Sequence, residues 1–255
     1  MTQEIEAVFF DLGNTLRFLQ KNDEHQLKAK QRIVELVGTE QDPQSFSELL
    51  AQRYKTYRKW AFEHMREAPE AELWTRWMAY DYPAERIAPL GPELTYLYRQ
   101  SAGLRVVVEH GKEVVQTLFD RGYTLGIISN LITTLEIPEW LEADGFIPYF
   151  KSIALSSVLG IRKPDPAIYH IAAKDAGVVP SRCAYIGDNL NRDVTGTRSA
   201  GFAMTIILIS PEELAEETIT DENRPDLIIH QITDLLDIFP ACPKVIFDER
   251  FQAPK

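Results

Sequence analysis

The chain has 255 residues, of which 45% are hydrophobic and 25% charged, a composition typical of a globular protein with a sizeable hydrophobic core. Its formal net charge of −11 at pH 7 disfavours nucleic acid or an anionic membrane surface as the main partner, because both carry negative charge. No apolar stretch reaches the length of a transmembrane helix, and the N-terminus lacks the features of a signal peptide, so we expect a cytoplasmic protein.

The first predicted element is a strand over residues 7–10, with the apolar sequence AVFF. The strand ends at Asp11, and the sequence LGNTL follows. A short, continuously apolar strand is typical of a parallel sheet that is covered on both faces. Since ligands of open α/β sheets bind at the carboxyl ends of the strands, Asp11 is the first candidate site residue.

Residues 17–103 have apolar side chains at helical spacing and lack the strand pattern of the rest of the chain. Predicted helices cover residues 23–37 and 43–65, and two shorter ones lie near residues 73–78 and 94–99. We therefore expect a mainly helical insertion after the first strand. Its aromatic side chains could line a substrate pocket or form the core of a helical bundle, and their spacing favours the core. These side chains are Trp60, Trp74, Trp77, Tyr80 and Tyr82.

From residue 104 onwards, apolar strands alternate with helices. The predicted strands cover residues 123–129, 151–156, 183–187, 203–209 and 226–230. The predicted helices cover residues 111–121, 166–176, 193–200 and 233–239, with a helical or turn segment that runs through residue 140. This alternation predicts an α/β fold with a doubly wound parallel sheet. Residues 1–16 and 104–255 would form this Rossmann-like core and residues 17–103 a helical domain, and no element is predicted for the tail after Pro240.

Polar residues of complementary chemistry follow four of the predicted strands. Besides Asp11, they are Ser129 and Asn130, then Lys163, and finally Asp188 and Asp193. Mg²⁺ prefers oxygen ligands and keeps several waters, so one or two carboxylates and a phosphate oxygen suffice to hold it. A lysine ammonium binds phosphate as a point charge, and an Asp carboxylate can attack phosphorus. The strand ends therefore predict a site for a divalent metal and a phosphate.

In this order along the chain, these residues resemble the four motifs of the haloacid dehalogenase superfamily. Asp11–Thr15 resembles the first motif and Ser129 the second. Lys163, in the sequence GIRKPDP, resembles the third, and Gly187-Asp188 with Asp193 resembles the fourth. The resemblance covers about residues 5–16 and 105–210. The helical insertion is located where this superfamily has its C1 cap domain.

The resemblance implies a Mg²⁺-dependent hydrolase, most often a phosphatase that acts on a small phosphorylated metabolite. In such an enzyme Asp11 is the nucleophile and forms an aspartyl-phosphate, while Lys163 orders the nucleophile and the phosphate. The phosphate would be held by Ser129, Asn130 and Lys163. The metal would be held by Asp11, the backbone carbonyl of Gly13, Asp188 and Asp193.

One position departs from the pattern of the superfamily. Its phosphatases usually have a second Asp two residues after the nucleophile, which protonates the leaving group, and here that residue is Gly13. General acid–base help is worth about 10²–10⁴-fold in rate, so two alternatives stay open: a dehalogenase-type hydrolase that attacks carbon, and a non-catalytic phosphate-binding or regulatory protein. His64 or His110 could replace the acid, although we expect both at the surface. The sequence alone predicts neither the substrate nor the oligomeric state.

Overall fold

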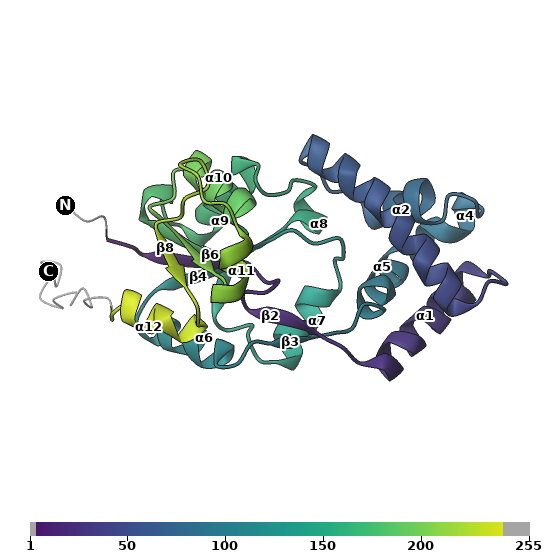
Figure 1. Cartoon of the computed structure of the whole chain (residues 1–255), viewed down its shortest axis with the longest axis horizontal. Coiled ribbons are helices and arrows are strands. Elements are labelled where there is room, and N and C mark those ends of the chain that lie inside the picture. The colour runs from purple at the N-terminus through teal and green to yellow at the C-terminus, as the bar shows by residue number, and fades with distance from the viewer. Residues whose placement is uncertain (1–3, 242–255) are drawn as a thin grey trace, which may run out of the picture.

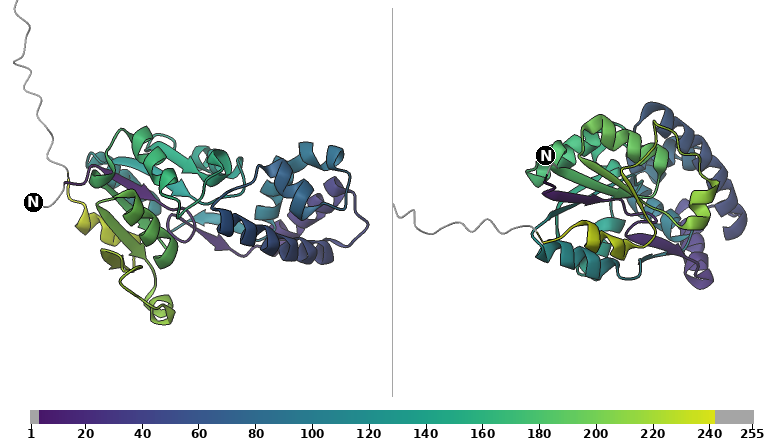
Figure 2. Two further views of the ribbon diagram at one scale, coloured as in Figure 1. Left: turned by 90° about the horizontal axis from the view of Figure 1, so that it is seen from above. Right: turned by 60° about the vertical axis from the view of Figure 1, so that its left-hand side comes forward.

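The computed structural model describes residues 4–241, and its core is a parallel sheet (Figures 1 and 2). Within these residues the sheet has six strands, in the order β5-β4-β1-β6-β7-β8. Its strands are β1 (Ala7–Phe10), β4 (Thr124–Ser129), β5 (Phe150–Leu155), β6 (Cys183–Gly187), β7 (Met204–Leu208) and β8 (Leu227–Ile229). The doubly wound α/β fold predicted from the sequence is confirmed. The tail after residue 241, for which no element is predicted, lies outside the described residues.

β1 lies in the middle of the sheet and is buried on both faces. It pairs in parallel with β4 and with β6, so that Phe10 is level with Ile127 on one side and with Ile186 on the other. Phe10 packs against one helical layer, whereas Phe9 packs against the other. This two-sided burial explains the continuous apolar run. It also places Asp11 at the carboxyl edge of the sheet, between the ends of two other strands.

Helices cover both faces of the sheet. One layer is formed by α6 (Gly111–Asp120), α7 (Glu136–Ala143) and α12 (Leu235–Ile238), and the other by α9 (Pro166–Ala176) and α10 (Leu190–Ala200). Shorter pieces are α8 (Ser156–Leu159), α11 (Pro211–Glu216) and the 3-10 turns Pro180–Arg182 and Ile232–Asp234. α11 has no counterpart in the sequence prediction, because it is short and rich in Glu. None of the helices in residues 4–241 is long and apolar enough to cross a membrane.

The helical insertion lies at the other end of the molecule from the sheet (Figure 2). Its helices are α1 (Asp23–Val37), α2 (Pro43–His64), α3 (Glu70–Glu72), α4 (Ala84–Ile87) and α5 (Gly91–Gln100), with a π-helical turn at Leu73–Met78 and a 3-10 turn at Ala88–Leu90. The side chains of Asn22 and Asp42 accept hydrogen bonds from backbone N–H groups of the first turns of α1 and α2. Such N-caps satisfy donors that have no partner within the helix. They explain why both helices begin where the sequence predicts.

The aromatic side chains of the insertion mostly form its own core. Trp74 and Trp77 are buried. Trp60 and Tyr82 pack against the same hydrophobic cluster, whereas Tyr80 is exposed. None of the five lines the cavity at the carboxyl edge of the sheet that is described below. The core interpretation of these side chains, rather than the pocket interpretation, therefore fits the structure.

Two short strands, β2 (Arg17–Gln20) and β3 (Leu104–Val107), form an antiparallel ribbon between the sheet and the insertion. Arg17 pairs with Val107, and Gln20 pairs with Leu104. The sequence interpretation assigns residues 17–20 to the helical part, so the ribbon is a correction. Strands this short and partly exposed lack the apolar periodicity by which a strand is identified. Only their pairing with each other, across the whole insertion, reveals them.

A second contact joins the insertion to the core at the loop before Lys163. The N–H of Glu67 donates to the carbonyl of Gly160 (3.1 Å), and the N–H of Arg162 donates to the carbonyl of Met65 (3.2 Å). The side chains of the same segments form a buried ion pair, with 2.7 Å between Glu67 Oε2 and Arg162 Nη1. The insertion is thus fastened both through the ribbon and through the loop that leads to a candidate site residue.

Candidate active site

Asp11 follows β1 and is almost fully buried at the carboxyl edge of the sheet. Its Oδ1 accepts hydrogen bonds from the N–H of Leu12 (2.7 Å) and from the hydroxyl of Ser129 (2.8 Å). Ser129 is the last residue of β4, the strand beside β1. Two donors therefore fix one oxygen of the Asp11 carboxylate, and its second oxygen contacts the cations of the site.

Lys163 is the central buried cation of this edge. Its Nζ lies 2.8 Å from Asp11 Oδ2 and 3.1 Å from Asp193 Oδ1, and it donates to the hydroxyl of Tyr185 (2.5 Å). The side chain of Asn130 holds the backbone of Lys163 in both directions. Its amide donates to the carbonyl (3.0 Å), and its Oδ1 accepts from the N–H (2.8 Å). An ammonium group is buried at tolerable cost only with such partners, so this lysine is built into the site.

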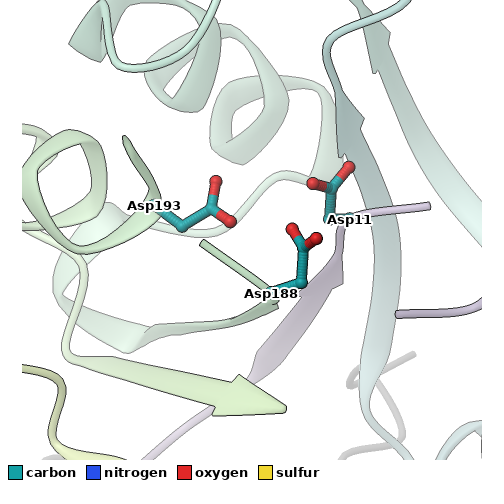
Figure 3. A group of neighbouring side chains, drawn as sticks. All are labelled: Asp11, Asp188 and Asp193. Carbon is teal, nitrogen blue, oxygen red and sulfur yellow. The ribbon is translucent and has the colours of Figure 1, made fainter. Parts of the chain in front are cut away.

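Three carboxylates converge at this edge of the sheet (Figure 3). One oxygen each of Asp11, Asp188 and Asp193 lies within 4.8 Å of the others. Asp188 directly follows β6, and Asp193 lies in the first turn of α10. That helix begins at Leu190 rather than at Asp193 as predicted, because the side chain of Asn189 caps it. The early start turns the carboxylate of Asp193 towards the sheet edge.

The acids of this cluster differ in their affinity for protons. Burial and the negative charge of Asp11 raise the pKa of Asp188 to about 6. Burial also acts to raise the pKa of Asp193, but the positive charges of Lys163 and Arg192 outweigh it and hold that pKa at about 2. At neutral pH the three side chains therefore concentrate negative charge at one place, and a nearby cation must balance it.

One such cation, Arg192, is a residue that the sequence interpretation misses. Its Nη2 contacts all three carboxylates, at 3.0 Å from Asp11, 3.1 Å from Asp188 and 3.2 Å from Asp193. The guanidinium thus lies where the three acids converge. Asp188 immediately precedes the Asn189 cap of α10 and Arg192 lies in the first turn of that helix, so a spacing of four residues brings the two side chains together. That spacing is the signal that could have identified it, although a charged residue in a helix is usually solvated.

Gly13 lies at the same edge and provides no side chain. A Cβ at this position would meet no atom within 4 Å, so the surroundings would tolerate an acid here. The two histidines considered from the sequence have other partners, although His110 lines a larger hollow that Asp188 also lines. His64 stacks on Trp60 in the insertion, and His110 contacts Glu113. Neither histidine lines the cavity beside the three carboxylates.

A cavity of about 240 Å³ opens at this edge of the sheet. Its lining joins some of the predicted site residues to the ribbon and α5, and it includes Asp11, Gly13, Arg17, Arg99, Arg105, Ser129, Asn130, Asp188 and Arg192. Lys163 and Asp193 are buried behind this lining and are not part of it. A larger hollow of about 720 Å³ adjoins Asp188 on the side of β7 and β8, but Asp11 is not part of its lining. The smaller cavity is therefore the one in which a ligand reaches Asp11 and Ser129 together.

Three arginines of this cavity share the carboxylate of Glu136, at the start of α7. Arg17 Nη1 lies 2.9 Å from its Oε1, and Arg99 Nε lies 2.7 Å from its Oε2. Arg105 Nε is more distant, at 3.7 Å from Oε1. Burial acts to raise the pKa of Glu136, but the three guanidinium groups outweigh it and hold that pKa at about 2. The sequence interpretation does not single out these four residues, which are far apart along the chain.

Comparison with known proteins places this site in a family. The sequence pattern of the haloacid dehalogenase-like hydrolases matches residues 5–201. Glyceraldehyde 3-phosphate phosphatase of Methanopyrus kandleri is 27% identical over 239 residues, which cover 92% of this chain and 97% of that protein. Phosphoserine phosphatase of Thermus thermophilus is 32% identical over 123 residues, 48% of this chain and 45% of that protein. A 2-haloacid dehalogenase of Pseudomonas syringae pv. Tomato shares the fold, with a TM-score of 0.65, 20% identity and coverage of 92% and 97% of the two chains.

The chain therefore belongs to the haloacid dehalogenase-like hydrolases, and it is a hydrolase. The family match at residues 5–201 contains every candidate site residue from Asp11 to Asp193. The resemblance inferred from the order of the four motifs is confirmed.

Proposed function

We propose that this chain is a Mg²⁺-dependent phosphatase of a small phosphorylated metabolite and that it acts through an aspartyl-phosphate formed on Asp11. The observation that carries the proposal is the setting of the Asp11 carboxylate. Ser129 and the Leu12 N–H fix one of its oxygens, and Lys163 lies beside the other. A carboxylate oriented in this way is suited to nucleophilic attack. The relatives that are named as phosphatases support the same class of reaction.

The residues at the sheet edge fit a divalent metal. Three carboxylates with oxygens within 4.8 Å of one another form the all-oxygen donor set that Mg²⁺ prefers, and the guanidinium of Arg192 already serves as their cation. We assign the metal to Asp11, Asp188 and Asp193 and to the backbone carbonyl of Gly13. Bound Mg²⁺ would neutralise charge on the phosphoryl group, which otherwise repels an anionic nucleophile.

The proposed reaction has two steps. An Asp11 oxygen attacks phosphorus, and the bond between phosphorus and the leaving oxygen breaks, so the leaving group departs with the electron pair. Water then attacks the acyl phosphate, which releases inorganic phosphate and restores the carboxylate. Ser129, the backbone of Asn130 and Lys163 would hold the phosphoryl oxygens. The fixed ammonium of Lys163 stabilises the negative charge that develops on them.

Gly13 determines which leaving groups this reaction favours. Without a carboxylate at that position, the general-acid contribution of about 10²–10⁴-fold is missing for substrates whose leaving oxygen needs a proton. Acyl phosphates and other activated esters are therefore the fastest substrates in this proposal. Simple alkyl phosphates are slower.

The dehalogenase alternative is not favoured. Attack on carbon requires no metal, whereas this site brings together three carboxylates that could hold one. The Methanopyrus relative that matches along nearly the whole chain is named as a phosphatase. The dehalogenase structure is 20% identical and indicates a common fold only.

Turnover of acetyl phosphate tests the proposal. We expect hydrolysis that requires Mg²⁺ and that falls at least about 10³-fold in Asp11→Asn, as expected when the nucleophile of a concerted site is removed. Asp120→Asn, at an exposed position at the end of α6, is the matched control and keeps wild-type activity. Tight binding of inorganic phosphate without any turnover would contradict the proposal and support the non-catalytic alternative. Metal-independent turnover of a 2-haloacid would support the dehalogenase.

A further inference from the structure

One wall of the cavity beside Asp11 carries more positive than negative charge. Arg17, Arg99 and Arg105 line the cavity, and in residues 4–241 Glu136 is the carboxylate that forms ion pairs with them. The three guanidinium groups carry three positive charges and Glu136 carries one negative charge, so two of the positive charges have no carboxylate of their own within the described residues. Burial and the charge of Arg99 lower the pKa of Arg105 to about 10, so Arg105 still carries its charge at pH 7.

Some donors on this wall have no acceptor within the described part of the chain. The Nε of Arg17 is buried and has no hydrogen-bond partner, and the residue as a whole is only 7% exposed. Glu136 accepts from Nε and Nη2 of Arg99, and the second amino group of Arg99 has no protein acceptor. Arg105 donates through Nη1 to the carbonyl of Arg99, and its Nη2 is likewise unpaired. The unpaired amino groups of Arg99 and Arg105 are not among the buried unpaired atoms of the described residues. They are therefore accessible to an acceptor from outside the chain, such as a ligand in the cavity that both residues line.

The chemistry of that acceptor follows from the donors. Guanidinium groups present paired N–H donors in one plane, which match the two oxygens of a carboxylate or of a phosphate. The excess of positive charge requires that the acceptor be an anion rather than a neutral hydroxyl or amide. These arginines are held in place by Glu136 and, for Arg17, by the Trp140 ring, 4.8 Å from the guanidinium carbon. The wall is therefore preorganised for an anion.

The location of the wall identifies the part of the substrate that it meets. The same cavity contains Asp11 and Ser129, where the transferred phosphoryl group binds under the proposed function. A ligand whose phosphoryl group is at Asp11 presents its leaving group to the rest of the cavity. With a volume of about 240 Å³, the cavity is below the roughly 300–1,000 Å³ of sites for drug-sized ligands, so only a few carbon atoms separate the two groups.

We propose that Arg17, Arg99 and Arg105 bind a second anionic group, a carboxylate or a phosphate, on the leaving part of the substrate. This inference rests on the proposed phosphatase function and narrows its substrate class to small phosphorylated acids or bisphosphates.

The test compares substrates that differ in one anionic group. Phosphoglycolate carries a carboxylate that one CH2 group separates from the ester oxygen, and its amide is neutral there with nearly the same shape. We expect kcat/KM to be about 10- to 100-fold higher for the acid than for the amide, the range of a charge-assisted hydrogen-bonded contact. Propane-1,3-diol bisphosphate against 3-hydroxypropyl phosphate makes the same comparison for a second phosphate. Whichever pair shows the larger ratio identifies the anion.

Variants of Arg105 locate the effect, because this residue makes the weakest contact with Glu136. Arg105→Met is expected to bring the acid-to-amide ratio close to one, mainly through KM for the acid, and Arg105→Lys, which keeps the charge, restores part of it. Arg76→Met, on the exposed surface of the insertion where Arg76 pairs with Glu72, is the control and leaves the ratio unchanged. Thermal unfolding of each variant separates a loss of anion binding from a loss of folding.

Three outcomes would overturn the inference: a kcat/KM ratio of one in both substrate pairs, a wild-type ratio in Arg105→Met, or an equal loss for both members of a pair, which would place the arginines on the transferred phosphate. If the protein hydrolyses no phosphate ester, the proposed function fails, and the wall is tested by binding alone. Phosphonoacetate and its amide, which cannot be hydrolysed, are then compared by calorimetry. Tighter binding of the acid that Arg105→Met abolishes supports the anion wall, and equal binding contradicts it.

Discussion

Gly13 is the single residue at which this site departs most from the family pattern, and it leads to a prediction about leaving groups. A side chain fits at position 13 because a Cβ there meets no atom within 4 Å. We expect Gly13→Asp to accelerate alkyl phosphates more than acetyl phosphate, so that log kcat/KM depends less steeply on the leaving-group pKa. Gly13→Ala is the control for the side chain without the acid. A flat dependence in the wild type would mean that another group already donates the proton.

Arg192 leads to a prediction about metal binding, since its guanidinium contacts the same three carboxylates that we assign to Mg²⁺. In Arg192→Met the apo protein loses the cation that balances buried acids, so it should unfold at a lower temperature. Added Mg²⁺ should then raise its melting temperature more than that of the wild type, and calorimetry without substrate should detect tighter binding. Lys174→Met, at an exposed position of α9, is the control. Weaker Mg²⁺ binding in Arg192→Met would contradict competition between the two cations.

At the scale of elements, Glu136 ties the start of α7 to the ribbon and to α5, and it leads to a prediction about pH. Its pKa of about 2 lies below the ordinary value of 4.5, so its charged form stabilises the fold above about pH 4.5, and this contribution is lost as the pH falls towards 2. We expect Glu136→Gln to lower the free energy of unfolding by about 3 kcal/mol at pH 7. Urea denaturation should find a smaller difference at pH 3. A difference that does not change with pH would rule out the ion pairs as its cause.

The central strands and the two long helices of the insertion are predictable from the sequence because each leaves a clear local pattern in it. β1, β4 and β6 are buried on both faces, so each appears as a continuous apolar run of strand length. α1 and α2 carry caps that mark their first residues. The ribbon of β2 and β3 has neither signal, since its strands are short, partly exposed and paired only with each other.

Some residues of the candidate site are likewise predictable from the sequence, and others are not. Asp11 and Asp188 directly follow strands of one parallel sheet, and Ser129 is the last residue of a third, so the topology alone brings them to one edge. Lys163 and Asp193 are found through the motif order. The arginine wall and Arg192 are not predictable from local sequence, because each charged side chain resembles a solvated one until tertiary packing places it against an acid. Long-range pairs of this kind require the fold before they can be recognised.

The whole molecule consists of a sheet-based core and a helical insertion, and the ion pair that joins them at the loop before Lys163 leads to a further prediction. Arg162 is the cation of the buried Glu67, whose pKa burial raises even in the presence of that partner. We expect Arg162→Met to destabilise the protein by about 3–5 kcal/mol at pH 7, the cost of leaving one member of a buried pair unmatched. Adding Glu67→Gln should recover part of the loss. A loss of stability below about 1 kcal/mol, typical of surface pairs, would contradict the proposed role of this ion pair in joining the insertion to the core.

The central claim is that Asp11 accepts the phosphoryl group, and transfer of labelled phosphate from acetyl phosphate to the protein tests it most directly. With Mg²⁺ present, rapid acid quenching followed by peptide mapping should recover the label on the peptide that contains Asp11, as an acyl phosphate that is stable in acid and labile in base. Asp11→Asn should remain unlabelled. Label on another residue, or turnover without any labelled protein at the shortest times, would contradict the account.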